Sequence, residues 1–290
     1  MQIPEIDPNE IIDFMNTDSM DFGLLTLTQR IRHFETEGYV VLPRMLETDH
    51  INKLKAELAD VSMRPKPYSQ YQTTAAEQPQ WTSRAVAELI GHPPMIEFLK
   101  ALMGPEIIFT RGFFQRTHPG SPGISMHTDG QPHGSSIFDY EGSSPRLLRV
   151  LYYLDDLIPQ RAPFRLIPRT HLSFHAQASP YVRYKSHPEE LTLCVKAGSA
   201  VIIPSTLFHG THPNTDSLAR EMIQFGYRPA WAGPIKPMKE WAPELVAAAP
   251  ERAKPFLQSL NSTGNTWGLE HKPKGMETEA TGINPSRWND

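Results

Sequence analysis

The sequence predicts a mainly β protein with flanking helices, built as a sandwich or a barrel. Proline is frequent, at 28 of 290 residues, and this favours loops and short strands over long helices. The middle of the chain holds short apolar runs that are separated by turns rich in Gly, Pro, Asn and Asp. Hydrophobic residues make up 39% of the chain, which suits a globular protein that buries a core.

The N-terminal third is expected to supply helices that support the β region. A first helix should end at Gly38, and a later one at Gly104, because glycine favours the end of a helix. Thr48 stands where an N-cap is expected before a run of apolar residues at helical spacing. The expected elements are helices at 24–38, 47–61 and 93–104, a strand at 39–43, and a long loop at 62–83.

The β region should begin after residue 105 and end near residue 229. Strands are expected at 106–115, 123–128, 147–154, 163–167, 191–195, 199–204, 206–212 and 218–228. No clean linker divides the chain, so we expect a single domain over 1–290. In this domain, 1–104 forms the helical support, 105–229 the β core, and 230–290 a C-terminal extension with one helical piece that could cover a pocket.

Composition and charge exclude several classes of function. The net charge is −4 without a run of Lys or Arg, which argues against a surface for nucleic acid or anionic membranes. Cys194 is the single cysteine of the chain, so no internal disulfide can form. We therefore expect a reducing, cytoplasmic location and an inert buried thiol. The first residues lack the pattern of a secretory signal, and no apolar stretch approaches the ~20 residues of a membrane helix.

The stretch "MHTDG" at 126–130 contains a candidate metal site. On a strand, His127 and Asp129 would project from the same face. One imidazole and one carboxylate together suit a metal of intermediate softness, such as Fe(II). Two ligands are too few, however, and the same residues would also suit a polar turn.

A third ligand is expected from the stretch 201–229. If this stretch forms a hairpin with its turn at 213–216, His209 lies opposite Arg220 and shares a face with Thr211. His209 would then complete a set of two histidines and one carboxylate, the arrangement of non-heme Fe(II) oxygenases. Arg220 could bind a carboxylate of a co-substrate, with a hydroxyl from Thr211. A slip of one residue would separate the set.

Other polar residues are expected to have structural roles. His212 competes with His209, but its parity and the following proline favour a surface role. His133 is expected in a loop, with a smaller chance of touching substrate. The remaining candidates are His118 and His171, expected to be structural, and Tyr152 and Tyr153, expected in the core or in a pocket wall.

With these residues in place, the chain resembles the phytanoyl-CoA dioxygenase family of Fe(II)- and 2-oxoglutarate-dependent oxygenases. The resemblance covers about two thirds of the chain. It is carried by "FETEGYVVLPRML" (34–46), "MHTDG" (126–130), "LYYLDDL" with "FRLIPRTH" (151–171), and "KAGSAVIIPSTLFHGTHPNTDSLAREMIQFGYRP" (196–229). The most specific element is a distal histidine that is followed eleven residues later by arginine.

The resemblance implies a double-stranded β-helix, which is a cupin-like jelly roll. It implies that His127, Asp129 and His209 bind iron as metal ligands and catalytic residues. It also implies that Arg220 and Thr211 bind the distal carboxylate of 2-oxoglutarate, while dioxygen is a substrate.

The resemblance also suggests one more cofactor contact and reveals some differences. Gln115 matches the position of a further 2-oxoglutarate contact best, and Arg116 is the alternative. The family commonly has Asn–Gly where this chain has 161–162, and glycine where it has Arg169. Some relatives have a tryptophan near Leu151. Halogenating relatives replace the metal-binding carboxylate with a small residue, so Asp129 argues against halogenation.

The expected reaction is hydroxylation of an unactivated carbon in a small molecule, with release of succinate and CO2. A secondary metabolite or a modified amino acid is the expected substrate, as in natural product biosynthesis. Desaturation, ring formation, endoperoxidation and hydroxylation of an acyl-CoA use the same cofactors. Outside this chemistry, a metal-dependent hydrolase or isomerase and a metal-free binding protein remain alternatives. The sequence does not predict an oligomeric state.

Overall fold

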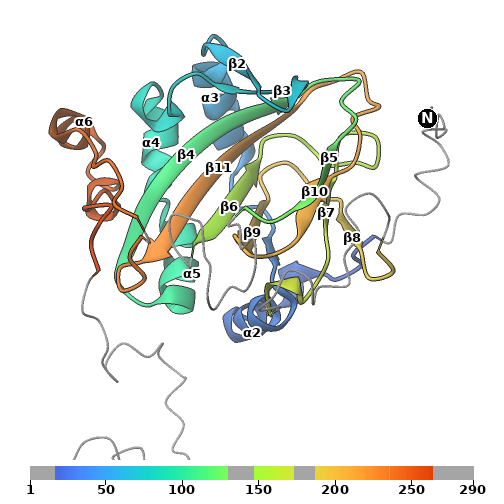
Figure 1. Cartoon of the computed structure of the whole chain (residues 1–290), viewed down its shortest axis with the longest axis horizontal. Coiled ribbons are helices and arrows are strands. Elements are labelled where there is room, and N and C mark those ends of the chain that lie inside the picture. The colour runs from blue at the N-terminus through green and yellow to red at the C-terminus, as the bar shows by residue number, and fades with distance from the viewer. Residues whose placement is uncertain (1–16, 130–146, 173–186, 235, 264–290) are drawn as a thin grey trace, which may run out of the picture.

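Two antiparallel sheets that face each other form the body of the protein (Figure 1). The structure, a computed structural model, describes residues 17–129, 147–172, 187–234 and 236–263. Seven strands form the larger sheet in the order β1-β9-β6-β11-β4-β3-β2, and four form the smaller sheet in the order β5-β10-β7-β8. This is the predicted jelly roll, in which neighbouring strands of a sheet come from distant parts of the chain.

The strands agree closely with the expected ranges between residues 106 and 229. The larger sheet contains Val40–Leu42 (β1), Met63–Lys66 (β2), Ser69–Ala75 (β3), Ile107–Thr117 (β4), Leu148–Tyr153 (β6), Ala200–Pro204 (β9) and Arg220–Pro229 (β11). The smaller sheet contains Ile124–His127 (β5), Phe164–Leu166 (β7), Leu191–Leu193 (β8) and His209–Thr211 (β10).

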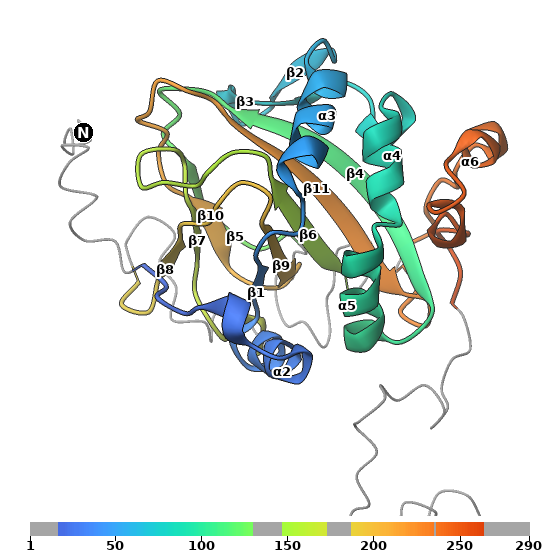
Figure 2. The same ribbon diagram turned by 180° about the vertical axis from the view of Figure 1, so that it is seen from behind.

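Helices cover the outer face of the larger sheet, as the view from behind shows (Figure 2). The α-helices span Leu27–Glu37 (α2), Thr48–Leu58 (α3), Arg84–Ile90 (α4), Pro93–Met103 (α5) and Pro243–Ala248 (α6). Short 3-10 turns occur at Phe22–Leu24, Pro79–Trp81, Thr170–Leu172 and Lys254–Phe256. None of the helices in the described ranges has the length and apolar character needed to cross a membrane.

Local sequence explains where these helices begin and end. The side chain of Thr26 caps α2, and Gln29 completes a capping box. The helix ends at Gly38, which takes a φ of 86°. For α3 the predicted N-cap is wrong by one residue. Glu47 holds the cap position without a side-chain hydrogen bond, and Thr48 is the first helical residue.

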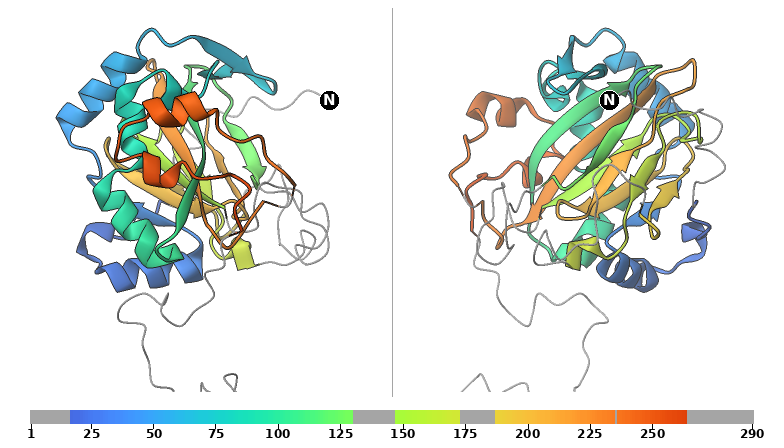
Figure 3. Two further views of the ribbon diagram at one scale, coloured as in Figure 1. Left: turned by 90° about the vertical axis from the view of Figure 1, so that its left-hand side faces the viewer. Right: turned by 45° about the vertical axis from the view of Figure 1, so that its right-hand side comes forward.

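Alternating side chains divide the larger sheet into an outer and an inner face. Arg116 shows where the outer face points, because its guanidinium donates to the carbonyl oxygen of Leu58 in α3. Phe114 lies on the same face under Arg116, and its strand partner Ile223 is fully buried. The inner face is turned toward the smaller sheet (Figure 3). Residues from both sheets line the main cavity.

The predicted loop at 62–83 is wrong. These residues form β2, β3 and a 3-10 turn, and the two strands lie at the edge of the larger sheet. Proline and exposed polar residues are tolerated at an edge, because the unpaired side of the strand faces water. Pro65 and the polar run around it therefore do not exclude a strand. The helix α4 was also not expected.

The predicted hairpin of residues 201–229 is also wrong. Its two strands lie in different sheets: β10 pairs with β5 and β7, whereas β11 pairs with β4 and β6. The connection crosses from one sheet to the other and is held by Asn214, which is fully buried. The amide of Asn214 donates to the carbonyl oxygens of Thr117 and Leu218. His209 and Arg220 therefore face each other across the cavity instead of along one sheet.

Two expectations about the periphery have different outcomes. Cys194 is exposed, so the expected buried thiol is wrong. The extension after β11 is tied to the body by Arg228, whose guanidinium donates to the carbonyl oxygens of Leu260 and Ser262. None of its described residues lines the main cavity. Residues 264–290, which belong to the expected pocket cover, lie outside the described residues.

Candidate active site

His127, Asp129 and His209 lie close together beside the smaller sheet, where they line the main cavity. One side-chain ligand atom from each lies within 4.8 Å of the other two. The two histidines are direct partners of the antiparallel pair β5–β10, and their ring centres are 4.5 Å apart. Asp129 lies two residues after His127, just beyond the end of β5, and its backbone N–H donates to the carbonyl oxygen of Ser205. The pairing of β5 with β10 and the short segment after β5 therefore bring the three side chains together.

The imidazole rings are oriented by the backbone. Nδ1 of His127 lies 2.8 Å from the carbonyl oxygen of Ser125, and Nδ1 of His209 lies 2.9 Å from that of Leu207. A carbonyl oxygen can only accept, so Nδ1 carries the proton in both rings. Each Nε2 then presents a lone pair, and these atoms lie 3.7 and 3.8 Å from the oxygens of Asp129. This donor set fits a metal ion.

The charge states also suit metal binding. Burial would raise the pKa of Asp129, but the positive charge of Arg149, the largest opposing influence, outweighs it and holds the pKa well below its usual range. Nε of Arg149 donates to Oδ2 of Asp129 at 2.9 Å. Burial lowers the pKa of His209 to about 4. At neutral pH the carboxylate is therefore ionised and the imidazole neutral, as ligation requires.

The three side chains line a cavity of about 620 Å³ between the two sheets. Apolar and polar residues share its wall. The apolar part includes Phe113, Leu151, Tyr153, Phe164, Ile203 and Met222, and the charged part consists of Lys66, Arg111, Asp129, Arg149 and Arg220. Lys66 and Tyr68, from the stretch 62–83, line the cavity, whereas Trp81 from the same stretch packs on Trp241 with ring centres 5.5 Å apart.

Arg220 enters the same cavity from the opposite sheet. Its side chain is 2% exposed and lies against the ring of Tyr153. Nη1 donates to the carbonyl oxygen of Ala162 and Nη2 to the hydroxyl of Thr117, each at 2.9 Å. Both partners are uncharged. The Nε atom is buried and has no hydrogen-bond partner among the described residues. A buried guanidinium with neutral partners and a spare donor fits an anionic ligand.

A chain of buried hydrogen bonds holds Arg220 in place from behind. The hydroxyl of Thr117 donates to Gln72, whose amide in turn donates to the hydroxyl of Ser121. All three residues are buried, in β4, in β3 and in the turn after β4. Satisfied networks of this kind fix side-chain positions in a core. The edge strand β3, which the sequence did not predict, thus contributes to the site.

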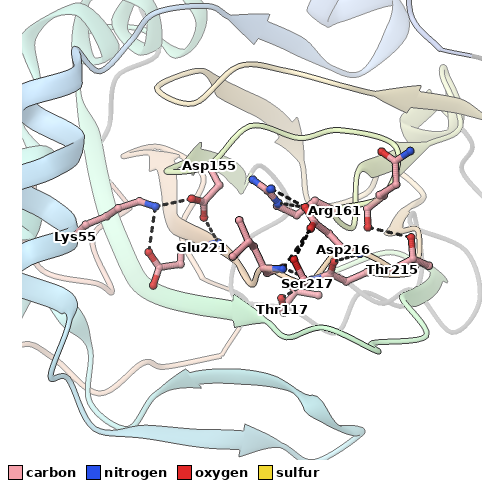
Figure 4. A network of polar contacts seen from close by, with 11 residues as sticks. Lys55, Thr117, Asp155, Arg161, Thr215, Asp216, Ser217 and Glu221 are labelled. Atoms are coloured by element: carbon pink, nitrogen blue, oxygen red, sulfur yellow. Dashed lines mark hydrogen bonds and ion pairs between the residues drawn. The ribbon is translucent and has the colours of Figure 1, made fainter.

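The first residues of β11 are fixed by ion pairs on the outer side (Figure 4). The backbone N–H of Glu221 donates to Asp155 at 2.7 Å, and Lys55 from α3 pairs with both carboxylates. In the crossing that leads to β11, Arg161 pairs with Asp216 at 2.6 Å. Arg220, the first residue of β11, therefore lies between two segments that ion pairs hold in place, the crossing before it and the strand after it.

The two positions where family members have glycine take left-handed backbone conformations. Ala162 has a φ of 43° and Arg169 a φ of 65°, values that L-residues rarely adopt. Arg169 pairs with Glu37 at 2.6 Å and with Glu189 at 2.5 Å. Both positions therefore have a backbone conformation that glycine adopts readily, although neither residue is glycine.

Thr211 and Gln115 also line the cavity, so the structure brings every predicted site residue to one place. The hydroxyl of Thr211 accepts from the backbone N–H of Ile124 at 3.1 Å, and its proton is left to donate. The amide of Gln115 points to Gln224 at 3.4 Å. Arg116, the alternative to Gln115, lies on the outer face and pairs with Glu221 at 2.7 Å.

The remaining candidates have the following surroundings. His212 is buried, 8% exposed, and its Nε2 lies 2.9 Å from the hydroxyl of Thr192, so the expected surface role is wrong. His118 contacts Thr73, and His171 contacts the carbonyl oxygen of Glu35. Tyr153 is a fully buried part of the cavity wall. His133 lies outside the described residues.

Arg149 is a site residue that sequence reasoning missed. The sequence contains a feature that could have revealed it: the run "LLRVLYYL" has one arginine among otherwise apolar and aromatic residues. Such a residue in a buried strand needs a carboxylate partner, and Asp129 supplies it. Thr117 gave no comparable signal, since its role depends on a cross-strand pairing with Arg220.

Comparisons with known proteins identify a family and a fold. The sequence model of the family described as "Phytanoyl-CoA dioxygenase (PhyH)" matches residues 34–222. The comparison with curated proteins gave no match.

Several solved structures share the fold. HygX from Streptomyces hygroscopicus, bound to nickel, 2-oxoglutarate and hygromycin B, superposes with a TM-score of 0.59 at 18% identity, over 71% of this chain and 88% of its own. The epimerase SnoN from nogalamycin biosynthesis gives 0.60 at 17% identity, over 72% and 82%. The carbocyclase SnoK from the same biosynthesis gives 0.59 at 17% identity, over 75% and 89%. At these identities the likeness shows the fold.

Proposed function

Because this chain belongs to the phytanoyl-CoA dioxygenase family, a family of iron(II)- and 2-oxoglutarate-dependent oxygenases, we propose that it hydroxylates an unactivated carbon of a small molecule. The observation that carries the proposal is the set of three ligand atoms within 4.8 Å, opposite a buried arginine with a spare donor. His127, Asp129 and His209 would hold iron(II), and Arg220 would bind the distal carboxylate of 2-oxoglutarate. The relatives HygX and SnoN, crystallised with 2-oxoglutarate, support this assignment.

The bound cofactors supply the hard chemistry: with iron(II), 2-oxoglutarate and dioxygen become succinate and CO2, and one oxygen atom goes to the product. The protein supplies positioning. Arg149 holds the carboxylate of Asp129, and backbone carbonyls hold the two imidazoles. With only three protein ligands, an iron ion held there would keep positions open for co-substrate and dioxygen.

The cavity wall provides the second contribution of the protein. Phe164 stacks beside His209 with ring centres 5.5 Å apart, and Leu151 and Met222 also line the cavity. These apolar groups exclude water from the reacting centre, which strengthens the electrostatic contacts there. Thr211 and Gln115 would add hydrogen bonds to 2-oxoglutarate.

A small molecule of natural product metabolism is the proposed substrate. The compounds bound to two relatives, hygromycin B to HygX and nogalamycin RO to SnoN, support this choice of size and class. The cavity of about 620 Å³ has the volume of a small-molecule site. SnoN is an epimerase and SnoK a carbocyclase, so enzymes with this fold carry out several kinds of reaction. Among these reactions we propose hydroxylation for this chain.

The proposal is tested by anaerobic titration of the metal-free protein with iron(II) and then 2-oxoglutarate. We expect one iron per chain and the weak visible absorption that a 2-oxo acid gives when it chelates iron(II). The His209→Ala protein should lose both, while His118→Ala, which changes a histidine outside the triad, should keep both. Folded wild-type protein that binds no iron would refute the proposal and favour a metal-free binding protein.

A further inference from the structure

The two groups proposed to bind the distal carboxylate of 2-oxoglutarate lie on different sheets. Arg220 is the first residue of β11 in the larger sheet, and Thr211 is the last residue of β10 in the smaller sheet. Both side chains line the cavity. Two groups on separate sheets bind one carboxylate well when other residues fix the spacing between them.

The turn at 118–123, between β4 and β5, connects these two groups. Before it lies Thr117, the last residue of β4, whose hydroxyl accepts from Nη2 of Arg220 at 2.9 Å. After it lies Ile124, the first residue of β5, whose backbone N–H donates to the hydroxyl of Thr211 at 3.1 Å. The same strand carries the metal ligand His127. One short segment thus contacts both carboxylate-binding groups and leads directly to the metal site.

Gln72 on the edge strand β3 links two points of this segment. Its side chain is buried, and its Oε1 accepts from the hydroxyl of Thr117 at 2.8 Å. Its Nε2 donates to the hydroxyl of Ser121 at 2.9 Å. The hydroxyl of Ser121 also accepts from the backbone N–H of Gly123 at 3.3 Å. A single amide group therefore joins the end of β4 to the middle of the turn.

The direction of these hydrogen bonds follows from Arg220. A guanidinium only donates, so the hydroxyl of Thr117 accepts from it and directs its own proton to Oε1 of Gln72. The amide nitrogen of Gln72 then faces Ser121. Without the acceptor at position 72, the hydroxyl of Thr117 is free to rotate, and Arg220 loses a fixed partner.

The turn also packs tightly against the smaller sheet. Gly123 has a positive φ, and a Cβ atom there would lie 2.4 Å from the carbonyl oxygen of Thr211. The backbone N–H of Asn214 donates to the carbonyl oxygen of Ser121 at 2.9 Å. Closely packed segments transmit small shifts to their neighbours. A change at Gln72 is therefore expected to reach both Arg220 and Thr211.

We propose that Gln72 is a positioning residue of the co-substrate site, which holds Arg220 and Thr211 at the spacing that one carboxylate requires. The inference rests on the proposed function for the identity of the ligand. Gln72 is not one of the described residues that line the cavity, so it acts through Thr117 and Ser121 and not by touching the ligand. The edge strand β3 thereby takes part in selecting a 2-oxo acid with a second carboxylate.

The inference is tested by anaerobic calorimetry on the iron-loaded full-length protein with two ligands. These are 2-oxoglutarate and 2-oxopentanoate, which has the same carbon chain without the distal carboxylate. Gln72→Met should weaken binding of 2-oxoglutarate by about five- to tenfold, the loss expected for one hydrogen bond. Binding of iron and of 2-oxopentanoate should not change.

Gln80→Met is the matched control. Gln80 is a buried glutamine in the 3-10 turn Pro79–Trp81, and its amide donates to Gln78. Its replacement should leave the affinity for both acids unchanged. Equal losses for the two acids in Gln72→Met, or a loss of iron binding, would show that Gln72 supports the fold in general and would overturn the inference.

Substitutions at Thr117 and Arg220 test the route. Thr117→Val removes the hydroxyl and should weaken 2-oxoglutarate binding by about tenfold, whereas Thr117→Ser keeps the hydroxyl and should bind like the wild type. The double variant with Gln72→Met and Arg220→Gln should lose little more than Arg220→Gln, because Gln72 acts mainly through the arginine. Fully additive losses contradict this route.

Hydrogen exchange of the metal-free protein gives a readout that needs neither iron nor co-substrate. The backbone N–H groups of Gly123 and Ile124 should exchange several-fold faster in Gln72→Met than in the wild type or in Gln80→Met. A wild type that binds no 2-oxoglutarate refutes the proposed function, whereas faster exchange in Gln72→Met still shows that Gln72 fixes this turn. Unchanged exchange together with unchanged affinity overturns the inference.

Discussion

The guanidinium of Arg220 donates a hydrogen bond of 2.9 Å to the backbone carbonyl oxygen of Ala162, a residue with a φ of 43°. The backbone N–H of Ala162 is also engaged, since it donates to Pro213 at 3.2 Å. The side chain of Ala162 is fully buried. An unusual backbone conformation, fixed on both sides, thus presents the carbonyl oxygen that orients the arginine of the proposed co-substrate site.

Replacing Ala162 by glycine should leave the stability of the protein within about 0.5 kcal/mol of the wild type. The left-handed conformation costs a non-glycine residue roughly 1–2 kcal/mol, whereas the greater freedom of glycine in the unfolded chain takes back about 0.4–1 kcal/mol and the loss of the buried methyl group about 0.8 kcal/mol. Urea unfolding of the metal-free protein measures the difference. Ala75→Gly, in β3 and without a positive φ, is the control and should lose stability. A loss of equal size in both variants would contradict this account.

Replacing Arg220 by glutamine should raise the 2-oxoglutarate concentration needed for half-maximal binding by at least about 30-fold. Removing one member of a buried charge pair costs about 2 kcal/mol or more, and every 1.4 kcal/mol is about tenfold. Iron binding should change little, because Arg220 contacts none of the three metal ligands through the hydrogen bonds that the described residues make. Calorimetric titrations with iron(II) and with 2-oxoglutarate separate the two effects.

Arg116→Gln is the matched control for this prediction. Arg116 lies in β4, close to Arg220, but its guanidinium points to the outer face and pairs with Glu221. Its loss should lower stability without a comparable change in 2-oxoglutarate affinity. Equal effects of the two substitutions on affinity would mean that Arg220 acts through the fold and not through the ligand.

Thr211 and Gln115 should each contribute one hydrogen bond to 2-oxoglutarate. Thr211→Val removes the hydroxyl at nearly constant volume, and we expect a roughly five- to tenfold loss of affinity, which corresponds to about 1 kcal/mol. Thr211→Ser keeps the hydroxyl and should bind like the wild type. Gln115→Met should show a loss of similar size, whereas Gln224→Met, its neighbour in the cavity wall, should not. Unchanged affinity in Thr211→Val would remove this residue from the proposed site.

The strands and the predicted site residues could be found from the sequence for identifiable reasons. Jelly-roll strands are short and bounded by turn residues, so their limits are visible in the pattern around Pro204 or Gly123. The pair His127 and Asp129 is local, and a spacing of two residues brings it together in any extended segment. The spacing between His209 and Arg220 is likewise a sequence feature.

Strand partners could not be found in the same way. The stretch with His209 and Arg220 has the appearance of a hairpin, and only the packing of two sheets shows that its strands lie opposite each other. The contribution of Arg149 depends on reaching Asp129, which belongs to a segment outside both sheets. The edge hairpin β2–β3 has polar residues and Pro65, and these hide a strand from composition-based reasoning.

His212 should make the stability of the protein depend on pH between about 4 and 6.5. Burial first, and then the charge of Arg165, lower its pKa in the folded protein to about 4, whereas an unfolded chain has a pKa near 6.5. Glu190 and the hydroxyl of Thr192 also face this ring. In this window the unfolded chain binds a proton that the folded protein does not. The contribution is therefore fully present above pH 6.5 and is lost as the pH falls toward 4.

The measurement is urea unfolding of the metal-free protein near pH 7.5 and near pH 5. His212→Gln keeps a polar group opposite Thr192 but removes the titration, so the wild type should lose up to about 2 kcal/mol more than this variant between the two conditions. Thr192→Val is the control, because it removes the hydrogen bond and leaves His212 buried. It should be less stable at both pH values and keep the steep dependence of the wild type. Parallel curves for the wild type and His212→Gln would show that another group carries the acid sensitivity.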